Sequence, residues 1–167
     1  NSELIIVGAG WLGSRVGQLM LRAGAQVTAE TLTSSSHGQI KAVGMIPRIR
    51  SSEGSFGSIL FAIPPSSGPG SYHSELNRAL SLWNKSGQFV FISSTSVYAE
   101  ENGGTVTEHS PLSDSLRAQT LIQAEKQVLQ AEGTVLRPAG LYDETSGPHT
   151  YYASQRTSDL RGDGIIN

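Results

Sequence analysis

The sequence contains no cysteine among its 167 residues. That absence excludes disulfide bonds and metal sites built on thiolates. It is typical of a reducing compartment, so we expect a cytoplasmic protein. The histidines show no metal-ligand spacing either, since they lie far apart at positions 37, 73, 109 and 149. The sequence therefore predicts no metal site.

A strong excess of one charge is also lacking, because 12 Lys and Arg stand against 14 Asp and Glu, for a formal net charge of −2. A chain without a basic cluster gives no indication of binding to nucleic acid or to an anionic membrane. No apolar run approaches the roughly 20 residues that cross a bilayer. The apolar start at residues 4–7 is too short for a signal peptide and lacks its basic lead. We expect neither nucleic acid nor a membrane as a partner.

The sequence does contain short apolar runs that alternate with helical periods. Strands are expected at residues 4–7, 26–29, 59–63, 89–92 and 134–136, with a candidate short strand within 43–49. Helices are expected from 12 to 24, at 76–83, and from a cap at Ser113 or Asp114 to about 131. Residues 66–71 are expected to form a loop, and most of 31–58 shows no clear period.

Apolar strands that alternate with amphipathic helices indicate a parallel sheet covered on both faces. We therefore expect an α/β fold, a Rossmann-type doubly wound parallel sheet, with one nucleotide-binding domain over residues 1–150. No secondary-structure period is visible from 153 to 164, and the sequence ends just after a new apolar pair. We expect 151–167 to begin a truncated or incompletely recorded C-terminal region.

A glycine-rich turn, Gly8-Ala9-Gly10-Trp11-Leu12-Gly13, follows the first strand and opens the first helix. In that context the G-x-G-x-x-G pattern predicts a dinucleotide site, whereas the alternative is a turn without a ligand. Gly8 permits the tight turn, Gly10 allows close approach of a pyrophosphate, and Gly13 allows the helix to pack on the strand. The N–H groups of the helix start, including those of Trp11 and Leu12, would face the phosphates.

The end of the second strand bears on the choice between NAD and NADP. An acidic residue there, about 20 residues after the turn, binds the ribose of NAD. Glu30 is close to that place, but alternation of Val27 and Ala29 with Thr28 makes Thr31 the strand-end residue. A hydroxyl adds no repulsion toward a 2′-phosphate, although no Arg or Lys lies between Arg22 and Lys41. The sequence favours NADP and leaves NAD open.

Three motifs in order resemble the NAD-dependent epimerase/dehydratase family, within the extended short-chain dehydrogenase/reductases. They are the glycine turn, the segment from Phe91 to Tyr98, and the segment from Leu136 to Tyr142. The resemblance covers about residues 4–143 and implies a nicotinamide cofactor. Family members usually continue into a smaller C-terminal substrate region, which is largely absent here.

The resemblance implies that Thr95 stands where the family has its catalytic Ser or Thr, whose hydroxyl binds the reacting substrate oxygen. The alternative is a strand-end hydroxyl that caps backbone groups. Ser93 and the segment Ile63-Pro64-Pro65 also end parallel strands, at the edge where ligands bind in such sheets. They are therefore expected to line the cofactor cleft, although Pro64-Pro65 would also serve simply to stop a strand.

The sequence departs from the family at its general base, a Tyr four residues before a Lys. None of the five tyrosines has a Lys four residues later, and matching Ala124-Glu125 to the family's helix places Arg117 and Leu121 at the two positions. The resemblance therefore implies an atypical member, which lacks the family's usual pair for proton transfer and keeps its cofactor-binding turn.

A few other side chains are candidates to substitute for this pair. Tyr98 is close to Thr95, but the resemblance implies packing for it. Lys126 is expected on the solvent face of its helix, and an isolated loop residue such as His109 is more often simply solvated. Arg137 is expected either beside the nicotinamide or on the surface, paired with a carboxylate.

The leading hypothesis is an NAD(P)-dependent oxidoreductase or epimerase acting on a sugar nucleotide or a similar carbonyl or alcohol substrate. The alternative is a catalytically degenerate dinucleotide-binding regulatory protein. The helix near 115–131 is a candidate surface for a homodimer, but its apolar face would equally cover only its own sheet.

Overall fold

A computed structural model of the chain describes residues 3–65 and 69–147. Its six strands are β1 (Glu3–Val7), β2 (Gln26–Thr31), β3 (Ile46–Ile49), β4 (Ser58–Phe61), β5 (Phe89–Ile92) and β6 (Thr134–Leu136). The α-helices are α1 (Trp11–Arg22), α2 (His37–Ala42), α3 (Pro69–Leu82) and α4 (Leu116–Gln130), with short 3₁₀ turns η1 (Ser34–Ser36) and η2 (Thr95–Val97).

All six strands pair in parallel, in the order β3-β2-β1-β4-β5-β6. The chain builds outward from β1 to β3 and then crosses back to place β4 on the other side of β1. The carboxyl ends of β1 and β4 therefore border the point where the strand order reverses, and ligands bind at such a point in open α/β sheets. The α/β Rossmann-type fold expected from the sequence is confirmed.

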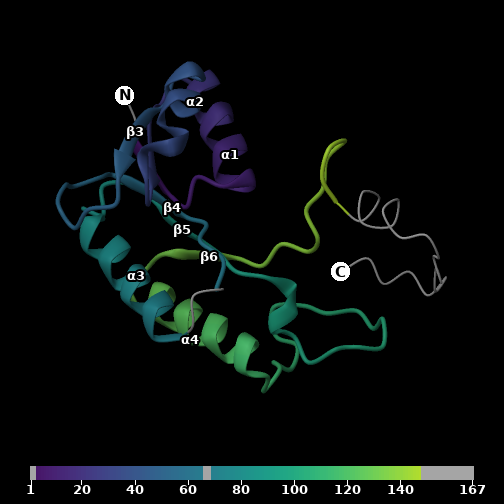
Figure 1. Cartoon of the computed structure of the whole chain (residues 1–167). Helices are drawn as coiled ribbons and strands as arrows, with labels where there is room; N and C mark the ends of the chain where they lie inside the picture. Colours follow the sequence, from purple (N-terminus) through teal and green to yellow (C-terminus); the bar gives the residue numbers. More distant parts are fainter. Residues whose placement is uncertain (1–2, 66–68, 148–167) are drawn as a thin grey trace.

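Helices cover both faces of this sheet, with α1 and α2 on one side and α3 and α4 on the other (Figure 1). Strand residues alternate between the two cores because successive side chains point to opposite faces. Ile6 packs with Val27 and Ala29 on the α1 side, whereas Ile5 and Val7 belong to the larger core beneath α3 and α4. Both faces of the central strands are thus buried, which explains their unbroken apolar runs.

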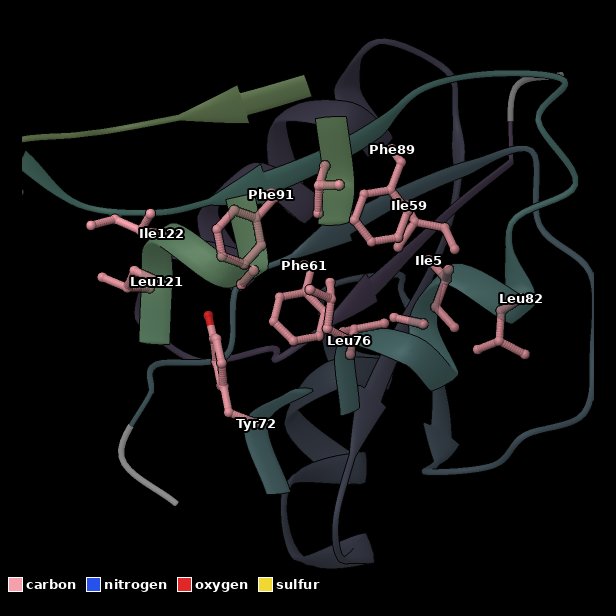
Figure 2. Close-up of a cluster of buried hydrophobic side chains, with 14 of the residues drawn as sticks. Ile5, Ile59, Phe61, Tyr72, Leu76, Leu82, Phe89, Phe91, Leu121 and Ile122 are labelled. Atoms are coloured by element: carbon pink, nitrogen blue, oxygen red, sulfur yellow. The ribbon is translucent and has the colours of Figure 1, made fainter. Parts of the chain in front are cut away.

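Aromatic rings fill the larger core at the carboxyl ends of β4 and β5 (Figure 2). The Phe61 ring stacks on Phe91 at a centroid distance of 5.7 Å, and Tyr72 of α3 meets Phe61 edge-on, also at 5.7 Å. Tyr72 is fully buried, and its hydroxyl oxygen is directed toward Leu121 and Ile122 of α4. That oxygen has no hydrogen-bond partner within the described structure, and burial raises the pKa of the hydroxyl above its ordinary value.

Replacing Tyr72 by phenylalanine is expected to stabilise the protein. The change keeps the ring contacts and removes a buried hydroxyl that lost its water without gaining a partner, which recovers about 1 kcal/mol. Urea unfolding of the two proteins measures this difference. Tyr72→Leu, which removes ring contacts as well, serves as the comparison and is expected to destabilise. A loss of stability in Tyr72→Phe would mean that the hydroxyl is hydrogen-bonded after all.

Two predicted boundaries and one unassigned region differ from the structure. The loop expected at 66–71 is wrong for its second half, because α3 begins at Pro69, and proline suits a first helical position where its missing N–H costs nothing. Strand β4 ends at Phe61 rather than at residue 63. Helix α2 lies in the unassigned region, and its one buried residue, Ile40, is too little for a visible period.

The N-cap of α4 is also a correction. Ser115 is the capping residue, and its hydroxyl accepts a hydrogen bond from the Ala118 N–H at 3.3 Å, instead of Ser113 or Asp114 as expected. The Ser113 hydroxyl instead accepts from the Ser115 N–H and so supports the cap from outside the helix. The proposed boundary at residue 150 lies outside the described residues.

Candidate functional site

Three glycines shape the turn between β1 and α1, and their surroundings differ. Gly8 has a φ of +99°, and a Cβ built on it would lie 2.9 Å from the backbone of Ala62 and Ile63. A Cβ on Gly13 would lie 2.4 Å from the Gly8 carbonyl oxygen and 2.8 Å from Ile6. The first glycine therefore permits the tight turn and the third permits close packing of the helix on the strand, as the sequence motif predicts.

Gly10 is different, because a Cβ built on it would meet nothing within 4 Å. The turn thus leaves open space beside the start of α1, where free N–H groups and the positive end of the helix dipole favour an anion. This open cradle fits the phosphates of a dinucleotide. Trp11 and Leu12 follow as the first residues of α1 and are both half-buried, and the indole Nε1 of Trp11 is buried without a partner within the described structure.

The end of β4 lies directly against this turn. The Ala62 N–H donates to the Val7 carbonyl oxygen at 2.9 Å, so the chain continues beside Gly8 as it leaves the sheet. Ile63 and Pro65 are half-buried and Pro64 is exposed. Of the three residues expected to line the cleft, Ile63 lies against Gly8, and Pro64 and Pro65 continue the chain beyond it.

Thr31 and Glu30, the two candidates for the residue beside the ribose, lie on opposite faces of the sheet at the end of β2. Thr31 is the last residue of the strand, and its hydroxyl lies 2.9 Å from His37 Nε2 and donates to the Thr33 carbonyl oxygen at 2.8 Å. Glu30 is buried on the other face, where Arg78 of α3 donates to it at 3.2 Å. The Glu30 carboxylate is thus turned away from Thr31 and engaged by a guanidinium.

Glu30 belongs to a network of charges between β2, β3 and α3. Arg48 lies 3.5 Å from Glu30, Arg78 also contacts Glu75 at 3.1 Å, and Arg50 pairs with the same Glu75. Burial alone lowers the pKa of Arg78, but hydrogen bonds and attraction from Glu30 and Glu75 outweigh it, so the pKa is raised. Three cations face two anions here, which leaves a net positive charge beside the carboxyl ends of β2 and β3.

A second buried network lies at the ends of β5 and β6. Glu125 of α4 is buried, accepts a hydrogen bond from Ser93 Oγ at 2.5 Å, and receives two from Arg137, at 2.9 Å and 2.6 Å. Arg137 also donates to the Tyr98 hydroxyl oxygen at 3.0 Å. Hydrogen bonding to Glu125 raises the pKa of Arg137 despite its partial burial. The Ser93 hydroxyl is therefore directed into the protein. Arg137 pairs with a carboxylate, which agrees with one of the two expectations for it, but the pair is partly buried and does not lie on the surface.

Thr95 begins η2 just beyond β5 and is half-buried. Its N–H donates to the Pro138 carbonyl oxygen at 3.1 Å, and its carbonyl oxygen accepts from the Tyr98 N–H, also at 3.1 Å. Backbone bonds thus fix the residue, while its hydroxyl makes no hydrogen bond within the described structure. Ser94 precedes it, and the Ser94 hydroxyl accepts from the Ser96 N–H.

The two positions matched to the family's Tyr and Lys have opposite surroundings. Arg117, at the Tyr position, is exposed on the first turn of α4, whereas Leu121, at the Lys position, is buried in the larger core. Lys126 is exposed on the far side of the same helix, and His109 is an exposed loop residue. The buried face of α4 covers its own sheet.

Arg15 of α1 is a residue that the sequence analysis missed. Its guanidinium lies 4.0 Å from the centroid of the Trp11 ring, donates to the Trp11 carbonyl oxygen at 3.2 Å, and forms an ion pair with Asp143. Asp143 is 128 residues away in sequence, so no local pattern could connect the two. Glu125 was also missed as a site residue, although a carboxylate on the apolar face of a predicted helix was a visible signal.

The described parts of the chain hold no cluster of three or more His, Cys, Asp or Glu suited to a metal ion. Within residues 3–65 and 69–147, no helix is long and apolar enough to cross a membrane.

Comparison with protein-family models gives no match, and neither does comparison with curated proteins. Solved structures do match. A conserved protein of unknown function from Silicibacter pomeroyi is 20% identical with a TM-score of 0.72, and the match covers 94% of this chain and 59% of that one. A putative NAD-dependent epimerase/dehydratase from Methylobacillus flagellatus is 21% identical with a TM-score of 0.67, covering 86% and 56%.

A third match is the UDP-glucuronic acid 4-epimerase from Bacillus cereus in complex with UDP-glucuronic acid and NAD. It is 16% identical with a TM-score of 0.64, and the match covers 87% of this chain and 59% of the epimerase. This chain therefore spans less than two thirds of each of the three proteins. In its fold, the chain is similar to NAD-dependent epimerases and dehydratases, the family that its three sequence motifs resemble.

Proposed function

We propose that this chain is the dinucleotide-binding part of an NADP(H)-dependent oxidoreductase of the epimerase/dehydratase type. The observation that carries the proposal is the glycine turn, which combines a positive φ at Gly8, a closely packed Gly13 and an open space at Gly10 at the reversal of strand order. This combination supports a bound pyrophosphate, because Gly8 and Gly13 shape the turn while Gly10 leaves space beside the helix start. The putative epimerase/dehydratase and the NAD-bound epimerase among the similar structures support the same cofactor class.

The preference for NADP is supported by the surroundings of Thr31. The carboxylate that would repel a 2′-phosphate, Glu30, faces the opposite side of the sheet and is neutralised by Arg78. His37 is able to donate to a phosphate, and so is the Thr31 hydroxyl once it turns away from the Thr33 carbonyl oxygen to which it donates here. Arg50 follows β3, and its N–H donates to the Thr31 carbonyl oxygen at 2.9 Å, while its guanidinium pairs with Glu75 of α3 and would have to leave that carboxylate to meet a 2′-phosphate.

The substrate class follows by analogy with the UDP-glucuronic acid 4-epimerase, and we infer a sugar nucleotide or a similar carbonyl or alcohol. When bound, a nicotinamide cofactor supplies hydride transfer. Thr95 holds the substrate oxygen through its hydroxyl, because its backbone is fixed at the end of β5 while that hydroxyl has no other bond. Ser93, two residues before Thr95, helps to fix this turn because its hydroxyl donates to the buried Glu125 carboxylate. A cytoplasmic location and a homodimer stay predictions.

A second function, a dinucleotide-binding regulatory protein without catalysis, is favoured by one specific observation. Leu121 stands buried in the core at the position matched to the family's Lys, and exposed Arg117 stands at the position matched to its Tyr. Neither side chain carries out the usual proton transfer of the family. A screen of sugar nucleotides with NADP⁺ and NADPH, followed by nicotinamide absorbance, separates the two functions, because turnover with any substrate excludes the second.

Calorimetric titration of the full-length protein with NAD⁺, NADH, NADP⁺ and NADPH tests the cofactor. We expect the protein to bind NADPH and NADP⁺ at least about tenfold more tightly than NADH and NAD⁺, because the added 2′-phosphate accepts charge-assisted hydrogen bonds. Thr31→Asp is expected to reverse this preference by repelling the 2′-phosphate, whereas Thr134→Val, an exposed threonine at the start of β6, leaves it unchanged. Absence of binding by all four nucleotides would refute the proposed function.

A further inference from the structure

A full positive charge is placed against the outside of the glycine turn. Side chains on a helix lean toward its N-terminus, and Arg15 follows this rule by folding back over Trp11. Its Nη1 donates to the Trp11 carbonyl oxygen at 3.2 Å, and its guanidinium carbon lies 4.0 Å from the indole centroid. The charge therefore sits at the phosphate-binding end of α1 rather than along the flank of the helix.

A carboxylate from the far end of the described chain holds this guanidinium. Asp143 pairs with Arg15, and its other oxygen accepts from the N–H groups of Thr145 and Ser146, each at 2.8 Å, and from the Thr145 hydroxyl. Partial desolvation acts to raise the pKa of Asp143, but these bonds and Arg15 outweigh it and lower the pKa to about 2. Asp143 is thus ionised at neutral pH.

Another anion is able to replace Asp143 as the partner of Arg15, because both side chains are partly exposed. The accessible fraction is 42% for the Arg15 side chain and 28% for the Asp143 side chain. Exposed ion pairs contribute little stability. A pyrophosphate brings two negative charges to the turn, where the helix start offers only partial positive charges. A phosphate oxygen is therefore able to replace the carboxylate as the partner of the guanidinium.

We propose that Arg15 pairs with the pyrophosphate of the bound dinucleotide, and that Asp143 holds the guanidinium beside the glycine turn until the phosphate replaces it. This inference rests on the proposed function and adds a binding residue to it. Arg15 then strengthens dinucleotide binding, whereas Asp143 competes with the phosphate and weakens it. The two members of one ion pair thus have opposite effects on affinity.

Titration of NADPH into the full-length variants tests the proposal. We expect Arg15→Met to weaken binding about tenfold, Arg15→Lys to weaken it less, and Asp143→Asn to tighten it about two- to fivefold, as charge-assisted bonds to a partly exposed phosphate allow. Arg22→Met removes the same charge from the exposed last turn of the same helix and is expected to change affinity less than twofold. Thermal unfolding checks that each variant folds.

Equal weakening of NADPH binding by Arg15→Met and Asp143→Asn would overturn the inference. An ion pair that only holds the two segments together would lose the same contact in either variant. Unchanged affinity in both would overturn it as well. These failures differ from failure of the proposed function. If the proposed function fails, the unaltered protein binds no dinucleotide; if only this inference fails, the unaltered protein binds NADPH but Arg15→Met and Asp143→Asn do not have opposite effects on affinity.

Discussion

Replacing Gly10 by valine is expected to weaken NADPH binding at least about 100-fold, because the added side chain takes the space of the phosphates and blocks two or more charge-assisted hydrogen bonds. The fold is expected to survive. Gly10 has a φ of −75°, which any residue adopts, and no atom lies within 4 Å of the added Cβ. Calorimetric titration with NADPH and urea unfolding measure the two effects separately.

Gly38→Val is the matched control for this experiment. Gly38 also has open space around its added Cβ, but it lies in α2, outside the glycine turn. We expect it to retain binding of NADH, which lacks the 2′-phosphate that the neighbouring His37 would meet, within about twofold, since Gly38 does not touch the pyrophosphate site. Gly13→Val is unsuitable, because its Cβ would lie 2.4 Å from the Gly8 carbonyl oxygen and would disrupt the fold itself. Retained affinity in Gly10→Val would show that the turn is structural and would refute the cofactor assignment.

Replacing Arg137 by methionine is expected to destabilise the protein by about 3–5 kcal/mol, the usual result of leaving one charge of a buried pair unpaired. Glu125 is 2% exposed, and Arg137 provides two of its hydrogen bonds. The Ser93 hydroxyl would be left as the remaining partner of the carboxylate within the described structure. The free energy of unfolding from urea titration at neutral pH measures the loss.

Two further variants establish the cause. Adding Glu125→Gln to Arg137→Met removes the unpaired charge while keeping an acceptor for Ser93, so we expect it to recover half of the loss or more. Arg22→Met, which removes an exposed arginine, is expected to change stability by less than about 0.5 kcal/mol. A loss below about 1 kcal/mol in Arg137→Met would contradict the view that the Glu125 charge depends on this partner.

The sequence predicted the strands well because their signal is local. A strand buried on both faces must be apolar along its whole length, so the runs at β1, β4 and β5 were visible without knowledge of their neighbours. The glycine turn was equally predictable from the sequence, since the conformation and packing that require each glycine lie within one βα unit. The exception is the contact of Gly8 with Ala62 and Ile63. Helix α2 was not readable, because it buries a single residue, Ile40.

The charged groups were decided by tertiary structure. Alternation along the strand already separated Glu30 from Thr31, but only the placement of Arg78, 48 residues later, shows how the buried carboxylate is paired. Ser93 was expected in the cleft, but Glu125 engages its hydroxyl from α4. Buried charges take whichever partner the packed elements bring near, and that partner has no fixed distance in sequence.

The sequence by itself determined the fold class, the order of the main elements and the position of the phosphate-binding turn, because hydrophobic period and glycine conformation act over a few residues. Tertiary structure alone decided that Arg15 meets Asp143, that Arg137 meets Glu125, and that Arg78 meets Glu30. These ion pairs join segments that become neighbours only when parallel strands align their carboxyl ends at one edge of the sheet.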